Sequence, residues 1–183
     1  MTTANKITIL RVLLVPVFLA AALLGQQLLA LFLFVLAGAT DWLDGYIARK
    51  ADQITDFGRF MDPLADKLLV TAALLFFIQT GQMPLWVVML VLTREFAVSG
   101  LRMMAAAQGK VIAAGKSGKL KTAVTFLGIT LMLTTFHNFV ILGPHELLGS
   151  LTLDGLFTGL ILLTTIYSGC EYLRDNYKVF WEK

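Results

Sequence analysis

Residues 28–49 read LLALFLFVLAGATDWLDGYIAR, an apolar run that ends in two aspartates and an arginine. Residues 28–39 carry no charged side chain, whereas Asp41 and Asp44 follow immediately. A helix that crosses a bilayer needs about 20 mostly apolar residues, and charged residues inside such helices are rare and usually functional. This stretch therefore predicts a membrane helix with a functional group at its end.

The rest of the chain repeats the apolar pattern. Of its 183 residues, 57% are hydrophobic and 15% are charged, whereas soluble domains carry about 25% charged residues. We predict an all-α, polytopic membrane protein with one domain, residues 1–183, and a retained N-terminal segment. The six transmembrane helices are expected at residues 7–25, 28–48, 61–79, 84–106, 118–139 and 150–172.

The distribution of lysine and arginine predicts how these helices are oriented. The connections after the first, third and fifth predicted helices carry no Lys or Arg, and every cation except Arg94 can be assigned to the other side. Because cytoplasmic segments are rich in Lys and Arg, we expect both termini in the cytoplasm. The net charge of +3 gathers at helix ends, which favours membrane lipids as a partner and no nucleic acid.

Four aspartates are predicted to share that cytoplasmic side. Asp41 and Asp44 close the second predicted helix, and Asp62 and Asp66 open the third. Spacings of three and four residues place each pair on one face of its helix. Four carboxylates at a bilayer edge repel one another unless they are neutralised. Carboxylate oxygens suit Mg²⁺ or Mn²⁺, so we predict a catalytic site for divalent metal ions.

The residues between the aspartates allow two interpretations. Gly45, Ala48 and Gly58 are small, which lets either a ligand or a neighbouring helix approach the backbone. Arg49 could bind a diphosphate with two parallel hydrogen bonds, or it could anchor the helix to anionic lipid.

Together these residues form the pattern D-x-x-D-G-x-x-A-R-x8-G-x-x-x-D-x-x-x-D from Asp41 to Asp66. This pattern resembles the signature of the CDP-alcohol phosphatidyltransferases. The resemblance implies six transmembrane helices, a homodimer, two divalent metal ions and displacement of CMP from a CDP-linked lipid by an alcohol. It implies metal binding by the four aspartates, with Asp66 also the catalytic base. It implies that the CDP-lipid is bound by Asp44, Gly45, Ala48, Arg49 and Gly58.

Four further stretches resemble the bacterial branch of this family that uses sn-glycerol 3-phosphate. They are Asn5–Arg11, Arg94–Arg102, Gly118–Thr122 and Gly169–Tyr172. This second resemblance implies CDP-diacylglycerol and sn-glycerol 3-phosphate as substrates, and phosphatidylglycerophosphate and CMP as products. It also implies a bacterial cell membrane location with the active site facing the cytoplasm.

An acceptor that carries a phosphate needs a basic pocket of its own. Arg94 is the first candidate, because it is the cation within an apolar segment and such residues are usually functional; alternatively, it pairs with a carboxylate such as Glu95. The predicted pocket is completed by Arg102, Lys119 and Lys121, which could instead anchor to lipid, and Thr8 and Arg11 are lesser candidates.

Other functions fit parts of this pattern. Inositol phosphate, serine or phosphatidylglycerol could replace glycerol 3-phosphate as the acceptor. A cation transporter would also use carboxylates, although its site usually lies near the bilayer midplane. A prenyltransferase binds lipid diphosphates through aspartates but resembles a longer family. Release of CMP distinguishes the favoured reaction from ion flux and from pyrophosphate release.

Overall fold

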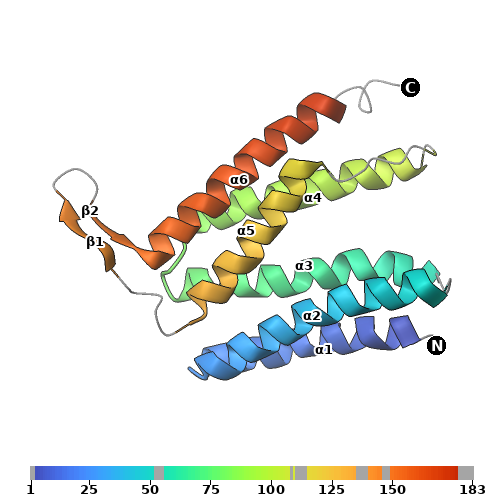
Figure 1. The fold of residues 1–183 in the computed structure, drawn as a ribbon, viewed down its shortest axis with the longest axis horizontal. Helices are drawn as coiled ribbons and strands as arrows, with labels where there is room; N and C mark the ends of the chain where they lie inside the picture. Colours follow the sequence, from blue (N-terminus) through green and yellow to red (C-terminus); the bar gives the residue numbers. More distant parts are fainter. Residues whose placement is uncertain are drawn as a thin grey trace. The chain divides into compact units, whose positions relative to one another are not determined.

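A computed structural model describes residues 3–51, 56–107, 109, 115–134, 140–145 and 149–176. Over these residues the chain forms two compact units, Met1–Thr80 with Leu133–Phe136, and Gly81–Met132 with His137–Lys183. We call them the first and the second unit. In the described residues the first unit has helices α1 (Thr3–Leu23), α2 (Gln27–Ala51) and α3 (Asp56–Gln79) (Figure 1). The second has α4 (Leu85–Ala107), α5 (Lys116–Met132), strands β1 (Val140–His145) and β2 (Gly149–Thr152), and α6 (Leu153–Asn176).

The six predicted helices are present in the predicted order within the described residues, so the helical fold class is confirmed. The predicted boundary at residue 150 was wrong, because residues 149–152 form β2, which pairs with β1 as an antiparallel hairpin. Helix α5 ends at Met132, before the predicted residue 139. Helix α3 begins at Asp56, before the predicted residue 61, so Gly58 is helical.

Local hydrogen bonds explain where two of the helices end or begin. After α1, the N–H of Gly25 donates to the carbonyl of Ala22, and the N–H of Gln26 donates to that of Ala21. This helix-ending pattern requires a left-handed residue, and Gly25 supplies it with φ of 75°. At the start of α6, the hydroxyl of Thr152 accepts a hydrogen bond from the N–H of Gly155, an N-terminal cap.

The first unit is held together by α1, which packs against both α2 and α3. The rings of Phe18 on α1 and Phe34 on α2 have their centroids 5.9 Å apart and are both buried. Small side chains fill much of the remaining interface, which lets the helix backbones approach closely. The buried alanines of this unit are Ala21, Ala22, Ala30, Ala37, Ala65, Ala72 and Ala73.

Successive helices of the first unit run in opposite directions. The start of α1, the end of α2 and the start of α3 therefore lie at the same end of this unit (Figure 1). The positions of the four aspartates lie in the half of α2 and the half of α3 that are nearer to this end.

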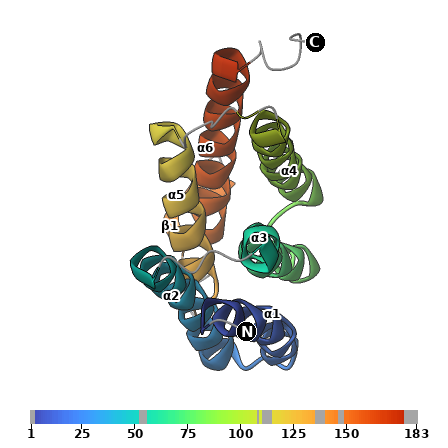
Figure 2. The same cartoon turned by 90° about the vertical axis from the view of Figure 1, so that its right-hand side faces the viewer.

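The second unit is centred on α6. Helix α6 packs against both α4 and α5, and Figure 2 shows it between them. The ends of α4 and α6 lie at the same end of this unit (Figure 1). Helix α5 begins beside the middle of α4, where Gly118 lies close to Arg94. The hairpin adjoins the opposite end of α6, where β2 leads directly into the helix.

Helices α5 and α6 pack closely at Gly128. A Cβ atom on Gly128 would lie 3.0 Å from Cδ1 of Ile161 and 3.3 Å from Cδ1 of Phe157. Both distances are shorter than ordinary van der Waals contact, so this position has no room for a branched side chain.

We expect Gly128→Val to destabilise the second unit, because overpacking a tight interface costs about 1–3 kcal/mol. The matched control is Gly159→Val on α6, where a Cβ atom would meet nothing within 4 Å. Thermal unfolding in detergent should show a lower midpoint for Gly128→Val than for Gly159→Val. Equal midpoints would contradict the close packing of α5 on α6.

Many large apolar side chains point outward from these helices. In the described residues, α6 is the helix that is long and apolar enough to cross a membrane, and Thr8–Leu23, Gln27–Thr40 and Lys67–Gln79 are shorter apolar helical segments. Exposed large apolar residues include Leu13, Leu28, Phe32, Leu75, Trp86, Phe96, Leu127 and Leu163. The predicted six-span topology with cytoplasmic termini stays a prediction.

Candidate functional site

The four aspartates lie in the C-terminal half of α2 and the N-terminal half of α3, within the first unit. Asp41 and Asp44 are three residues apart in α2, and Asp62 and Asp66 are four residues apart in α3. Helical backbone at these positions supports the predicted sharing of a face within each pair. Their side chains lie outside the described part of the structure, so their roles as metal ligands, and that of Asp66 as base, stay predictions.

The predicted CDP-lipid residues follow the same helices. Gly45, Ala48 and Arg49 lie in the last turns of α2, and Gly58 lies in the first turn of α3. An all-carboxylate donor set next to small residues suits a hard divalent cation and a phosphate ligand. The side chains of Ala48 and Arg49 also lie outside the described residues, so the predicted contacts to the lipid are untested.

The second unit contains a buried cluster of charges that joins α4 to α5. Nη1 of Arg94 lies 3.1 Å from Oε1 of Glu95. Nζ of Lys121 lies 2.5 Å from the same oxygen. The side chain of Lys121 is 3% exposed, that of Arg94 13% and that of Glu95 25%. One carboxylate thus holds two cations, which leaves the trio of Arg94, Glu95 and Lys121 with a net positive charge.

The trio of Arg94, Glu95 and Lys121 pairs charges that would otherwise lie without a partner between apolar helices. Arg94 and Glu95 lie near the middle of α4, and Lys121 lies in the second turn of α5. An unpaired charge in such surroundings costs several kcal/mol, so pairing across the two helices favours this arrangement over one with isolated ions. The anticipated pairing of Arg94 with Glu95 is confirmed.

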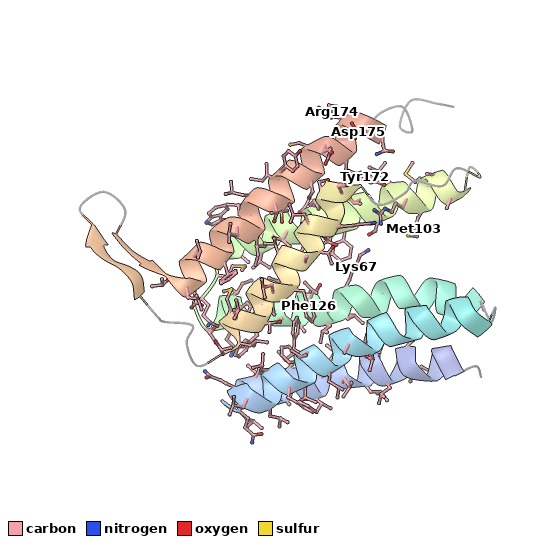
Figure 3. The ribbon with its side chains drawn as sticks, viewed as in Figure 1. Lys67, Met103, Phe126, Tyr172, Arg174 and Asp175 are labelled. Atoms are coloured by element: carbon pink, nitrogen blue, oxygen red, sulfur yellow. The ribbon has the colours of Figure 1, made fainter. Side chains whose placement is uncertain are left out.

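A second cation lies two helical turns further along α4. The guanidinium carbon of Arg102 lies 5.6 Å from the centre of the Tyr172 ring, a distance typical of a cation–π contact. Tyr172 also packs against Val98 and Leu101 of α4. Figure 3 shows Tyr172 close to the end of α6. This contact places Arg102 beside the last turns of α6.

Several buried polar atoms near these cations have unused hydrogen-bonding capacity. Nε of Arg94, Nε of Arg102, Oε2 of Glu171 and the hydroxyl of Tyr172 have no hydrogen-bond partner among the described residues. Buried polar groups are usually satisfied, and exceptions often have a functional reason. Two of the four atoms are guanidinium donors, which suit an oxyanion.

The remaining predicted basic residues lie in different surroundings. Lys119 is exposed on α5. Thr8 and Arg11 belong to α1 in the first unit, where each is 1% exposed. The structure therefore brings Arg94 and Lys121 together on Glu95 and places Arg102 further along α4, whereas the binding of acceptor phosphate by any of these residues is untested.

Sequence reasoning missed the bridging role of Glu95 and the residues of α6 around Arg94. A Cβ atom on Gly169 of α6 would lie 3.3 Å from Cγ of Arg94, and one on Gly118 of α5 would lie 3.8 Å from its Nη2. Both glycines fall in stretches that had already been singled out by resemblance. Their contacts with Arg94 could not be read from spacing, because they join separate helices.

We expect Lys121→Met to destabilise the protein by about 1–3 kcal/mol, because Glu95 would lose a buried charged partner. Lys119→Met, two residues earlier on the exposed side of α5, is the matched control and should change stability little. Denaturant or thermal unfolding of both variants measures the difference. A stable Lys121→Met protein would show that the ion pair does not hold α4 to α5.

Comparison with known proteins identifies the class to which these helices and this aspartate spacing belong. The profile of the CDP-alcohol phosphatidyltransferase family matches residues 1–167, which include parts of both units. The chain belongs to this family, as the aspartate signature predicted.

The chain is also similar, over most of its length, to individual proteins. The chain is 39% identical to the CDP-diacylglycerol–glycerol-3-phosphate 3-phosphatidyltransferase of Bacillus subtilis, over 95% of this chain and 94% of the relative. It is 40% identical to the protein of the same name from Pseudomonas fluorescens, over 84% of this chain and 85% of the relative. A probable phosphatidylglycerophosphate synthase of Mycobacterium tuberculosis is 36% identical, over 94% of this chain and 82% of the relative.

Proposed function

We propose that the chain is a CDP-diacylglycerol–glycerol-3-phosphate 3-phosphatidyltransferase. It transfers the phosphatidyl group of CDP-diacylglycerol to sn-glycerol 3-phosphate, with phosphatidylglycerophosphate and CMP as products. The observation that carries this proposal is the complete aspartate signature, which runs from the C-terminal half of α2 into the N-terminal half of α3. Relatives named for this reaction match most of the chain at 36–40% identity.

The aspartates bind two divalent metal ions, Mg²⁺ or Mn²⁺, in this proposal. Asp41, Asp44, Asp62 and Asp66 would hold these ions, which when bound neutralise negative charge on the diphosphate. Gly45, Ala48 and Gly58 leave room for the CDP group beside the helix backbones. Arg49 and Asp44 contact the same group.

Asp66 acts as the general base. It takes the proton of the acceptor hydroxyl, and the hydroxyl oxygen forms a new bond to the phosphatidyl phosphorus. The bond between that phosphorus and the oxygen shared with CMP breaks, and CMP leaves with the electron pair. Phosphoryl-type transfer depends mainly on positioning and charge stabilisation, so the placement of the Asp66 carboxylate matters more than its intrinsic basicity.

The phosphate of the acceptor binds to the basic residues of the second unit. Arg94 is the main ligand, since its Nε atom has no hydrogen-bond partner among the described residues and guanidinium groups match phosphate geometry. Arg102, Lys119 and Lys121 add positive charge. Thr8 and Arg11 are lesser candidates for the same phosphate.

The proposed enzyme is a homodimeric, multi-pass protein of the bacterial cell membrane, with one domain over residues 1–183. All six helices cross the bilayer, both termini are cytoplasmic and the site faces the cytoplasm. The many exposed apolar side chains of the helices support this placement, because lipid tails are the solvent that such a surface favours. The diacyl tails of the substrate can then stay in the bilayer during the reaction.

We expect the purified protein to release CMP from radiolabelled CDP-diacylglycerol when sn-glycerol 3-phosphate and Mg²⁺ or Mn²⁺ are added. Inositol phosphate, serine and phosphatidylglycerol serve as the comparison acceptors. Asp66→Asn should lower CMP release to background, because the base is lost, and keep part of the metal-dependent binding of CDP-lipid.

Two results would contradict this assignment. Near-normal turnover by Asp66→Asn would exclude Asp66 as the base. Faster CMP release with another acceptor than with glycerol 3-phosphate would reassign the acceptor while leaving the reaction class in place.

We expect Arg94→Ala to raise the KM for glycerol 3-phosphate at least 10-fold, since a charged hydrogen bond to a phosphate contributes about 1.5–3 kcal/mol. The KM for CDP-diacylglycerol should change less than 3-fold, as expected for loss of binding to one substrate only. Arg174→Ala, on the exposed end of α6, is the control. An unchanged acceptor KM in Arg94→Ala would refute the phosphate pocket.

A further inference from the structure

The side chain of Arg94, on α4, lies close to residues of both α5 and α6. Its stem lies against α6 at Gly169, where a Cβ atom would come within 3.3 Å of Cγ of Arg94. Its guanidinium lies near Gly118 of α5, where a Cβ atom would be 3.8 Å from Nη2. The 3.3 Å distance is shorter than ordinary van der Waals contact, so a Cβ atom at position 169 would require the stem to shift by a few tenths of an ångström.

The other end of the side chain is held by charge. Nη1 of Arg94 donates a hydrogen bond to Oε1 of Glu95 over 3.1 Å. Lys121 donates to the same oxygen and is almost fully buried. Because its ammonium would lose this partner by moving, Lys121 fixes the Glu95 carboxylate, and that carboxylate orients the guanidinium.

We propose that Gly169 and Glu95 are positioning residues for acceptor binding, which act by holding Arg94 in its productive orientation. This inference rests on the proposed function, in which Arg94 binds the acceptor phosphate. Neither residue has to touch the acceptor. Gly169 supplies free space under the stem, and Glu95 supplies a fixed partner for the guanidinium.

The physical basis of this role is preorganisation. A free arginine side chain has many rotamers, and a ligand that has to select one of them loses affinity. A side chain confined between α5 and α6 and tied to Glu95 has lost most of this freedom before the acceptor arrives. The donor Nε is buried and has no hydrogen-bond partner among the described residues, so the restraint on Arg94 does not use this donor.

Gly169→Ala tests whether the free space at Gly169 is needed to position Arg94. The added methyl group would push the Arg94 stem by a few tenths of an ångström, and small misplacements of a binding group have large kinetic effects. We expect the KM for glycerol 3-phosphate to rise about 3- to 10-fold, with kcat and the KM for CDP-diacylglycerol changed less than 2-fold.

Gly159→Ala on the same helix is the matched control. Its Cβ atom would meet nothing within 4 Å, and both substitutions replace glycine with a better helix former. A gain in helix propensity is therefore common to the two variants, and a difference in acceptor KM between them reports the contact with Arg94.

The double variant separates positioning from a general structural effect. In an Arg94→Ala background the stem is absent, so Gly169→Ala should add no further increase in the KM for glycerol 3-phosphate. Glu95→Gln, which keeps the shape and removes the charge, should raise the same KM and likewise add nothing in the Arg94→Ala background.

Calorimetric binding of glycerol 3-phosphate in detergent, without CDP-lipid, completes the test. Weaker binding by Gly169→Ala than by Gly159→Ala supports the inference, and equal binding overturns it. A full additional effect of Gly169→Ala in the Arg94→Ala background also overturns it. If the wild-type protein binds glycerol 3-phosphate with this difference between variants but releases no CMP, the proposed reaction fails and the positioning role stands.

Discussion

The structure depends on the pairing of charged side chains inside apolar helices with side chains of opposite charge. Arg94 and Glu95 are adjacent charges in the mainly apolar helix α4, and Lys121 of α5 shares the Glu95 carboxylate. Because unpaired buried charges are costly, this trio restricts how α4 and α5 can rotate about their axes. The same pairing leaves one excess positive charge, which a phosphate can neutralise in the proposed reaction.

Small residues make these close contacts possible. Gly169 lets the Arg94 stem lie against α6, and Gly128 brings α5 close to Ile161 and Phe157 of α6. Alanines have the same effect between the helices of the first unit. Close approach of backbones is how apolar helices gain packing energy where burial from water contributes little. In the second unit the same absence of side chains also shapes the surroundings of the candidate phosphate ligand.

The four aspartates of the signature and the trio of Arg94, Glu95 and Lys121 lie in different units. The four aspartates of the signature lie in α2 and α3, where divalent ions would neutralise them. The buried cations Arg94 and Lys121 lie in α4 and α5. Carboxylates select hard cations and guanidinium groups select phosphates, so each set suits a different part of the proposed reaction.

Local patterns in the sequence predicted the six helices, the last residue of α3 at Gln79, and the family. Apolar length, breakers such as Gly25 and the fixed spacing from Asp41 to Asp66 are properties of neighbouring residues, so they can be read without the fold. The sequence also identified Arg94 as a candidate, because a cation within an apolar segment usually has a functional role. Only the tertiary structure decided that Lys121, 26 residues after Glu95, shares the Glu95 carboxylate with Arg94, and that Gly169 faces the Arg94 stem. These contacts depend on how each helix is rotated against its neighbours, and that rotation follows from the packing of all side chains in the interface.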